Sequence, residues 1–174
     1  MRAFTVSALC ALALQLGCSD TLTWRVVDRM IEAKFPGVPT ITTDSLAHRL
    51  ADTTATRPVL LDARSPDEYA VSHLPGAQRI SPDADPIVGV DTLSRDTPIV
   101  VYCSVGYRSA RVTARLRKQG FTNVTNLNGS IFRWADEGRT VVRDGTPVRA
   151  VHPYNGTWGV LLNTNLHPRP QDSS

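Results

Sequence analysis

Short apolar runs and longer amphipathic segments alternate along the middle of the chain. The apolar runs predict strands within residues 40–42, 59–61, 76–80, 98–102 and 121–129. The amphipathic segments predict helices within residues 44–51, 65–73, 109–120 and 130–138. Strands that alternate with helices are typical of an α/β fold. We therefore expect a single domain whose central, mostly parallel sheet carries helices on both faces.

The ends of the predicted helices carry capping signals. Asp44 is expected to cap the first helix, and Ser65 to cap the second, with Pro66 at its first helical position. Ser130 is expected to cap the last helix. Along the third helix, three apolar residues are expected to face the core: Val112, Ala114 and Leu116.

We place the α/β domain over residues 40–147, with an extension on each side. Four apolar residues recur at helical spacing in the first extension, residues 18–39: Val26, Val27, Met30 and Ile31. This amphipathic helix is expected to pack on the domain rather than to lie on a membrane surface. The second extension, residues 148–174, contains one expected strand at Trp158–Leu162 and a polar end that is expected to be disordered.

The first residues have the layout of a bacterial export signal. Arg2 precedes an apolar run from Ala3 to Leu16, which is too short to span a membrane. The segment "LQLGC" at the end of this run resembles the lipobox of bacterial lipoproteins, in which the cysteine is lipidated and becomes the new N-terminus. We therefore expect residues 1–17 to be a signal peptide and Cys18 to carry a lipid anchor.

The segment departs from the lipobox at one position, because Gln15 stands where leucine is usual. Two alternatives stay open. Cleavage near Ala11–Ala13 would release a soluble exported protein, and an uncleaved signal would remain as an anchor. We expect an exported protein of the periplasm or cell envelope, whose contact with the membrane is the lipid on Cys18.

The net charge and the positions of the cysteines limit the partners and the reactions that fit this chain. The 174 residues carry a net charge of +3, with basic residues spread along the chain and no interleaved aromatic residues, so we expect no nucleic-acid partner. Of three cysteines, Cys10 lies in the apolar run and Cys18 is the candidate lipid site, which leaves Cys103 as a single thiol. Such a thiol in an exported protein is either a buried apolar side chain or has chemistry to perform.

Cys103 follows directly on the apolar run "PIVVY", which predicts a buried central strand. Open α/β sheets place their ligand sites at the carboxyl ends of such strands. The residues "SVGY" between Cys103 and Arg108 form a tight turn, in which Gly106 supplies the backbone freedom that the bend requires. Inward N–H groups and the start of the next helix favour an anion there and lower the pKa of the thiol.

The length of this turn distinguishes sulfur from phosphorus chemistry. Cysteine phosphatases separate their cysteine and arginine by five residues, a ring that fits a tetrahedral phosphate. Here Cys103 and Arg108 are separated by four residues. The shorter ring suits a sulfur atom bound to the cysteine better than a phosphoryl group, so phosphate or arsenate chemistry is disfavoured.

Three ordered segments are similar to the signatures of the rhodanese-like sulfurtransferase domain family. They are "LLDARSPDEYAVSHLPGAQRI" (Leu60–Ile80), "VVYCSVGYRSARVTARL" (Val100–Leu116) and "LNGSIFRWADEG" (Leu127–Gly138). The resemblance implies that Cys103 is the nucleophile and takes up a sulfur atom as a persulfide. It implies that Arg108 closes the active loop and adds charge. The N–H groups that stabilise the sulfur would be those of Ser104, Val105, Gly106, Tyr107 and Arg108.

The resemblance also implies the partners of the reaction: a small sulfur-donor anion, and a thiol or a cyanide-like acceptor. We expect no cofactor and a monomer. One position departs from the family, because members active on thiosulfate often carry a basic residue next to the cysteine, where this chain has Ser104 and Val105. The donor, thiosulfate or a persulfide, therefore stays open. A non-catalytic module of the same fold, which binds an anion or a partner protein, is the alternative function.

Other polar residues are interpreted as structural support. Asp62 and Arg64 are expected to form a structural pair, and His73 to hydrogen-bond locally in its turn. Tyr107 is as well suited to face a substrate as to support the loop. The remaining histidines show no ligand spacing with one another or with Cys103, so we expect no metal site. They are His48, His152 and His167.

Overall fold

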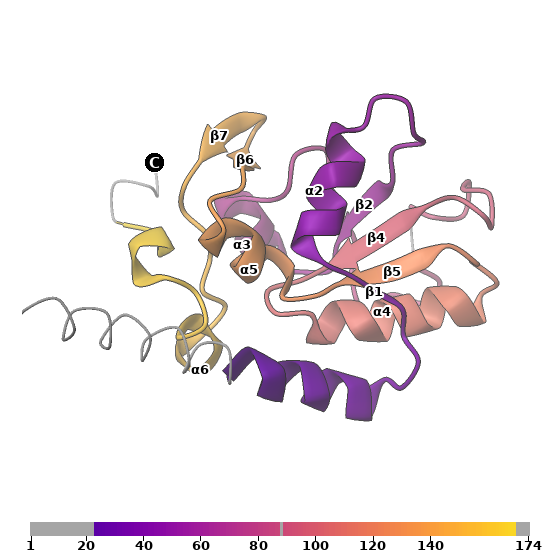
Figure 1. Cartoon of the computed structure of the whole chain (residues 1–174), viewed down its shortest axis with the longest axis horizontal. Helices are drawn as coiled ribbons and strands as arrows, with labels where there is room; N and C mark the ends of the chain where they lie inside the picture. The colour runs from indigo at the N-terminus through magenta and orange to yellow at the C-terminus, as the bar shows by residue number, and fades with distance from the viewer. Residues whose placement is uncertain (1–22, 88, 170–174) are drawn as a thin grey trace, which may run out of the picture.

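A five-stranded sheet forms the centre of the protein, whose computed structural model describes residues 23–87 and 89–169 (Figure 1). Its strands are β1 (Thr40–Ile41), β2 (Val59–Asp62), β3 (Gln78–Arg79), β4 (Ile99–Tyr102) and β5 (Val124–Leu127). They lie in the order β1-β5-β4-β2-β3, and every neighbouring pair is parallel. The predicted α/β class and parallel sheet are confirmed, and β4 is the central strand.

Helices cover both faces of this sheet, as predicted (Figure 1). The helices of the domain are α2 (Thr43–Ala51), α3 (Pro66–Val71), α4 (Tyr107–Lys118) and α5 (Ser130–Asp136). In Figure 1, α4 lies on one side of the sheet, whereas α2 and α5 lie on the other. A further helix over residues 23–34 precedes β1.

The central strand β4 shows why two core layers form. Its side chains alternate between the faces of the sheet, because successive residues of a strand point in opposite directions. Ile99 and Val101 pack in the cluster that includes the buried face of α4, whereas Val100 and Tyr102 pack in the cluster that includes α2 and α5. Each of the four side chains is at most 1% exposed, and burial of such a side chain contributes about 1.5–3 kcal/mol.

Two capping predictions are wrong. The N-cap of α2 is Thr42, whose side chain accepts a hydrogen bond from the Ser45 N–H at 3.1 Å, while Asp44 lies inside the first turn. The N-cap of α5 is Gly129, and Ser130 is the first helical residue. The Ser130 hydroxyl instead accepts a hydrogen bond from the N–H of Cys103 and donates one to the carbonyl of Leu127, each at 3.1 Å.

The predictions for the start of α3 and for the buried face of α4 are closer to the structure. Ser65 caps α3 and Pro66 is its first residue, as predicted. In α4, Val112 and Leu116 are buried as predicted, but Ala114 is only half-buried and Thr113 is buried in its place. The buried face of α4 is therefore less apolar than its sequence pattern suggests.

The N-terminal helix, residues 23–34, packs on the domain as predicted. Val27 and Ile31 are buried in the core cluster that includes α2 and α5, whereas Val26 and Met30 are 66% and 38% exposed. The helices within the described residues are too short or too polar to span a bilayer.

The C-terminal extension differs from its prediction. Trp158–Leu162 does not form a strand, because the Asn155 side chain accepts a hydrogen bond from the Trp158 N–H and starts the short helix α6 (Gly156–Gly159). The 3-10 helix η1 (Thr164–Leu166) follows in the same extension. Just before the extension, β6 (Val141–Arg143) and β7 (Thr146–Val148) form a separate antiparallel pair. The end that is expected to be disordered, residues 170–174, lies outside the described residues.

Candidate active site

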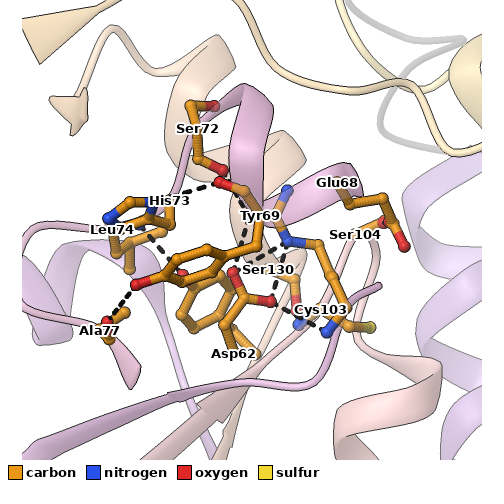
Figure 2. Close-up of polar contacts among 12 residues, drawn as sticks. Asp62, Glu68, Tyr69, Ser72, His73, Leu74, Ala77, Cys103, Ser104 and Ser130 are labelled. Atoms are coloured by element: carbon orange, nitrogen blue, oxygen red, sulfur yellow. Dashed lines mark hydrogen bonds and ion pairs between the residues drawn. The ribbon is translucent and has the colours of Figure 1, made fainter. Parts of the chain in front are cut away.

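The loop that contains Cys103 links the central strand β4 to the start of α4 at Tyr107. Cys103 is therefore at the carboxyl end of a buried parallel strand, as the sequence predicts. Its side chain is only 1% exposed. Figure 2 shows Cys103 next to Ser130, and Ser104 next to Glu68.

Hydrogen bonds to α5 and β5 set the shape of the loop. The carbonyl groups of Cys103 and Ser104 accept hydrogen bonds from the N–H groups of Ile131 and Phe132, each at 3.2 Å, at the start of α5. The Asn126 side chain on β5 donates to the carbonyl of Gly106 at 3.1 Å. These partners hold three loop carbonyls away from the sulfur, which leaves N–H groups available to it.

Two groups of the loop donate toward the Cys103 sulfur. The N–H of Gly106 lies 3.2 Å from Sγ, and the Ser109 hydroxyl lies 3.5 Å from it. Burial disfavours the thiolate, but the positive charge of Arg108 and hydrogen bonds from Ser109 and Gly106 outweigh it and lower the pKa of Cys103. The charge and the hydrogen bonds around Cys103 therefore favour its thiolate, although the residue is almost fully buried.

Gly106 is required by the geometry of the loop and by a neighbour from the N-terminal helix. Its φ of 109° is one that residues with a side chain rarely adopt. A Cβ on this residue would lie 3.3 Å from Cδ1 of Ile31. The same helix is followed by Phe35, whose ring meets Tyr107 edge-on at 5.2 Å. The N-terminal extension therefore supports the active loop by packing against Gly106 and Tyr107.

A buried carboxylate holds Arg108 in place. The guanidinium of Arg108 donates two hydrogen bonds to Glu68, both at 2.7 Å, and a third to the Ser104 hydroxyl at 2.9 Å. Ser104 also donates to Glu68 at 2.8 Å. The Glu68 side chain is 2% exposed, so the pair is shielded from solvent on the side of the carboxylate.

The local sequence places Glu68 for this contact. It is the third residue of α3 and forms a capping box with Ser65, in which each side chain bonds to the backbone N–H of the other. Burial favours the neutral form of Glu68, but bonds from Arg108, Ser65 and Ser104 outweigh burial and lower its pKa to about 2. Glu68 therefore stays ionised and fixes the position of the Arg108 guanidinium beside the loop.

Sequence analysis missed Glu68 as part of the site. The capping box was visible as serine followed three residues later by glutamate, but that signal predicts the start of a helix and not a contact 40 residues away. It missed Ser109 as well, which follows the loop inside α4 and donates to the sulfur.

A small pocket opens above the sulfur and has a volume of about 90 Å³. Its lining residues are Cys103, Ser104, Val105, Tyr107, Arg108, Tyr154 and Trp158. Four of the five predicted loop residues thus line the pocket, and Gly106 forms the turn beneath it. Tyr107 both lines the pocket and supports the loop through Phe35. Tyr154 and Trp158 come from the C-terminal extension, where the sequence predicts a strand at Trp158–Leu162 and no role for Tyr154.

The structural residues predicted near the site form a separate cluster. Asp62 and Arg64 are both fully buried, and Arg64 donates to Asp62 at 2.6–3.1 Å and to the carbonyl of Ser72 at 2.6 Å. His73 stacks on the ring of Tyr69 at 3.9 Å, and its Nδ1 contacts the Tyr69 carbonyl at 3.2 Å (Figure 2). Asp62, Arg64 and His73 do not line the pocket at Cys103.

The remaining histidines each contact other partners. His48 faces Asp44, while His152 and His167 hydrogen-bond within the C-terminal extension. Within residues 23–87 and 89–169, no three side chains of histidine, cysteine, aspartate or glutamate come together as a metal site. Cys18 and Cys10 lie outside the described residues.

Comparisons with known proteins agree with this fold and loop. The family model of the rhodanese-like domain matches residues 42–137. A sulfurtransferase of Allochromatium vinosum is 37% identical over 102 residues, which are 59% of this chain and 92% of that protein. The thiosulfate sulfurtransferase GlpE of Pseudomonas fluorescens is 33% identical over 91 residues, which are 51% of this chain and 81% of that protein.

A solved structure shows the same relationship in three dimensions. A rhodanese-like domain protein from Staphylococcus aureus superposes with a TM-score of 0.54 at 27% identity, and the match covers 62% of this chain and 99% of that one. The matched family segment contains β2, β4, the loop after Cys103 and α5. With more than half of its length matched, and with the cysteine loop at the end of the central parallel strand, this chain belongs to the rhodanese-like domain family.

Proposed function

We propose that the protein is a sulfurtransferase that carries sulfane sulfur as a persulfide on Cys103. The Cys103 thiolate attacks the outer sulfur of a donor, the bond between that sulfur and the rest of the donor breaks, and the leaving group departs with the electron pair. Thiosulfate would release sulfite, and an organic persulfide would release a thiolate. A thiol or cyanide acceptor then attacks the outer sulfur of the persulfide, which restores the Cys103 thiolate.

The observation that carries this proposal is the environment of the Cys103 sulfur. The N–H of Gly106 and the hydroxyl of Ser109 point toward it, and Arg108 lies near enough to lower its pKa. The thiolate is the reactive form of cysteine, so the loop activates the nucleophile that the reaction requires. The same donors would stabilise the negative charge of a persulfide, which replaces the thiolate at this position.

The test is sulfur loading, measured by intact-protein mass spectrometry. The full chain is incubated with thiosulfate or with an organic persulfide, and we expect a gain of one sulfur atom that is lost again on addition of cyanide or a dithiol. Cys103→Ser is the matched control and should gain nothing. If no donor adds sulfur to the wild-type protein, the alternative of a non-catalytic binding module becomes the better one.

Phosphatase activity is the second measurement. Arg108 is turned toward Glu68 by two hydrogen bonds, so it does not present a free guanidinium for the oxygens of a phosphate. Aryl phosphates should therefore give no turnover above that of Cys103→Ser. Turnover that disappears in Cys103→Ser would contradict our interpretation of the loop.

Export and lipid anchoring through Cys18 form a separate proposal, which rests on the sequence of the first 18 residues. In this proposal the protein acts in the periplasm or cell envelope, and the lipid is its attachment to the membrane. Cys18→Ala should move the protein from the membrane fraction to the soluble fraction, or leave an unprocessed precursor, with sulfur loading of Cys103 unchanged. Membrane association that survives both this change and removal of residues 1–17 would contradict lipid anchoring.

A further inference from the structure

The mouth of the active-site pocket is built partly by residues outside the matched family segment. Tyr154 and Trp158 belong to the C-terminal extension, whereas the family model ends at residue 137. With Tyr107 they place three aromatic side chains among the seven residues that line the pocket. The chemistry of this mouth is therefore a property of this chain, and it bears on the identity of the sulfur donor.

The fold holds this aromatic mouth in place. The extension is anchored by buried Val151, Leu162 and Leu166, and the Val151 N–H donates to the Leu166 carbonyl at 2.8 Å. Asn155 caps α6 and thereby fixes Trp158. Tyr154 has a φ of 65°, which is strained for a residue with a side chain. Strained backbone that the surrounding structure maintains is concentrated at functional sites.

The charge at the base of the pocket is already compensated. Arg108 is the only cationic side chain among the described residues that line it. Glu68 takes two of its hydrogen bonds, and the ring of Tyr154 lies 4.6 Å from its Cζ. Ser104 and Val105, the two residues that follow Cys103, add no positive charge. A doubly charged donor such as thiosulfate therefore meets a single cation, which already donates three hydrogen bonds to Glu68 and Ser104.

The size of the pocket determines where the donor must lie. A volume of about 90 Å³ has room for the transferred sulfur and a few more atoms. The rest of an organic donor would lie against the aromatic rings at the mouth, where an apolar group is removed from water and contributes binding energy. Tyr154 is 43% exposed and Trp158 is half-buried, so both have surface to offer a ligand.

We propose that Tyr107, Tyr154 and Trp158 form a subsite for the apolar organic group of the donor, so that the protein takes sulfur from organic sulfane donors in preference to thiosulfate. This inference rests on the proposed sulfur transfer through Cys103 and specifies its substrate class. The reaction step is the same for each organic donor: Cys103 attacks the sulfane sulfur, and the organic leaving group departs with the electron pair.

The test compares two donors that differ in the organic group alone. Benzenethiosulfonate and methanethiosulfonate both carry one negative charge, and each loses its sulfane sulfur to the Cys103 thiolate and releases a sulfinate. We expect kcat/KM of the full chain to be at least about tenfold higher with the phenyl donor, which corresponds to about 1.4 kcal/mol. Thiosulfate should be a poorer donor than either.

Variants of the mouth identify the cause of this preference. Trp158→Ala and Tyr154→Ala should each lower kcat/KM for the phenyl donor by a larger factor than kcat/KM for the methyl donor, and so reduce the ratio of the two. Tyr154→Phe keeps the ring and should keep the ratio. Val160→Ala is the matched control, because Val160 follows α6, is 76% exposed and does not line the pocket.

The outcomes separate this inference from the function on which it rests. Sulfur transfer without a preference for the phenyl donor, or with a preference that the mouth variants leave intact, would overturn the aromatic subsite and leave sulfur transfer standing. An equal loss of activity with both donors would show that these residues only support the loop, and would overturn the subsite as well. No transfer from any donor would overturn the function and the subsite together.

Discussion

Replacement of Glu68 by glutamine tests whether the buried ion pair holds the active loop. The pKa of Glu68 is lowered from 4.5 to about 2 in the folded protein. Each tenfold change in proton affinity is worth about 1.4 kcal/mol, so the charged form of Glu68 contributes about 3 kcal/mol at neutral pH. Loss of one partner from a buried ion pair has a similar effect, about 3–5 kcal/mol. Glu68→Gln should therefore lower the free energy of unfolding by about 3 kcal/mol at pH 7.

The sign of the pH dependence provides a second check. A carboxyl group whose pKa is lowered by folding stabilises the protein above its unfolded-state pKa, and this contribution is lost as pH falls through the folded-state value. The difference between wild type and Glu68→Gln should shrink from about 3 kcal/mol at pH 7 to about 1.4 kcal/mol at pH 3. Urea unfolding followed by circular dichroism measures both values.

Asp67→Asn is the matched control for this experiment. Asp67 precedes Glu68 in the first turn of α3 and is exposed, so it shares the helix dipole but not the ion pair. Its replacement should change stability by less than about 1 kcal/mol at pH 7. A difference between wild type and Glu68→Gln that stays constant from pH 7 to pH 3, or that equals the effect of Asp67→Asn, would refute the argument.

Three other substitutions, and one control at Arg117, probe the loop and its surroundings. Arg108→Gln should raise the pKa of Cys103, measured from its alkylation rate against pH, and slow sulfur loading. Arg117→Gln, at an exposed position near the far end of α4, should do neither, and equal effects of the two changes would contradict a local role. Gly106→Ala should lower the thermal midpoint and slow sulfur loading, since strain at such a φ costs about 1–3 kcal/mol; wild-type rates would show that the loop tolerates a side chain. Asp62→Asn leaves a buried guanidinium without its counter-charge and should lower the free energy of unfolding in urea by about 3–5 kcal/mol. A loss below that of Asp67→Asn would contradict the structural pair.

The fold was predictable because each local signal agreed with the others. The apolar run Ile99–Tyr102 indicates a strand covered on both faces, and β4 is the central strand of a parallel sheet. The serine and proline at the start of α3 mark its first turn. The position of Cys103 at the carboxyl end of β4 follows from the same alternation of strands and helices, so the location of the candidate site was available from the sequence.

The partners of the site were not available in the same way. Glu68 and Arg108 are 40 positions apart in the sequence, and no local sequence pattern predicts that they pair. Tyr154 and Trp158 reach the pocket because the C-terminal extension folds back over the loop, a path that periodicity does not encode. Ser130 has the residue type and position of a helix cap, but its hydroxyl accepts a hydrogen bond from the N–H of Cys103. Contacts of this kind depend on tertiary packing, which overrides local propensity.

The near-complete burial of Cys103 limits what can remove sulfur from it. Within the described residues it is the single cysteine, so a persulfide formed there cannot be resolved by a neighbouring thiol of the same domain. A flat macromolecular surface cannot reach a cysteine that is 1% exposed and lies in a pocket lined by aromatic side chains. An acceptor would need its nucleophile on a narrow stem, either a small thiol or a cysteine at the tip of a protruding loop. In the proposed reaction, the shape of the pocket would thus select the molecule that carries sulfur away as well as the one that brings it.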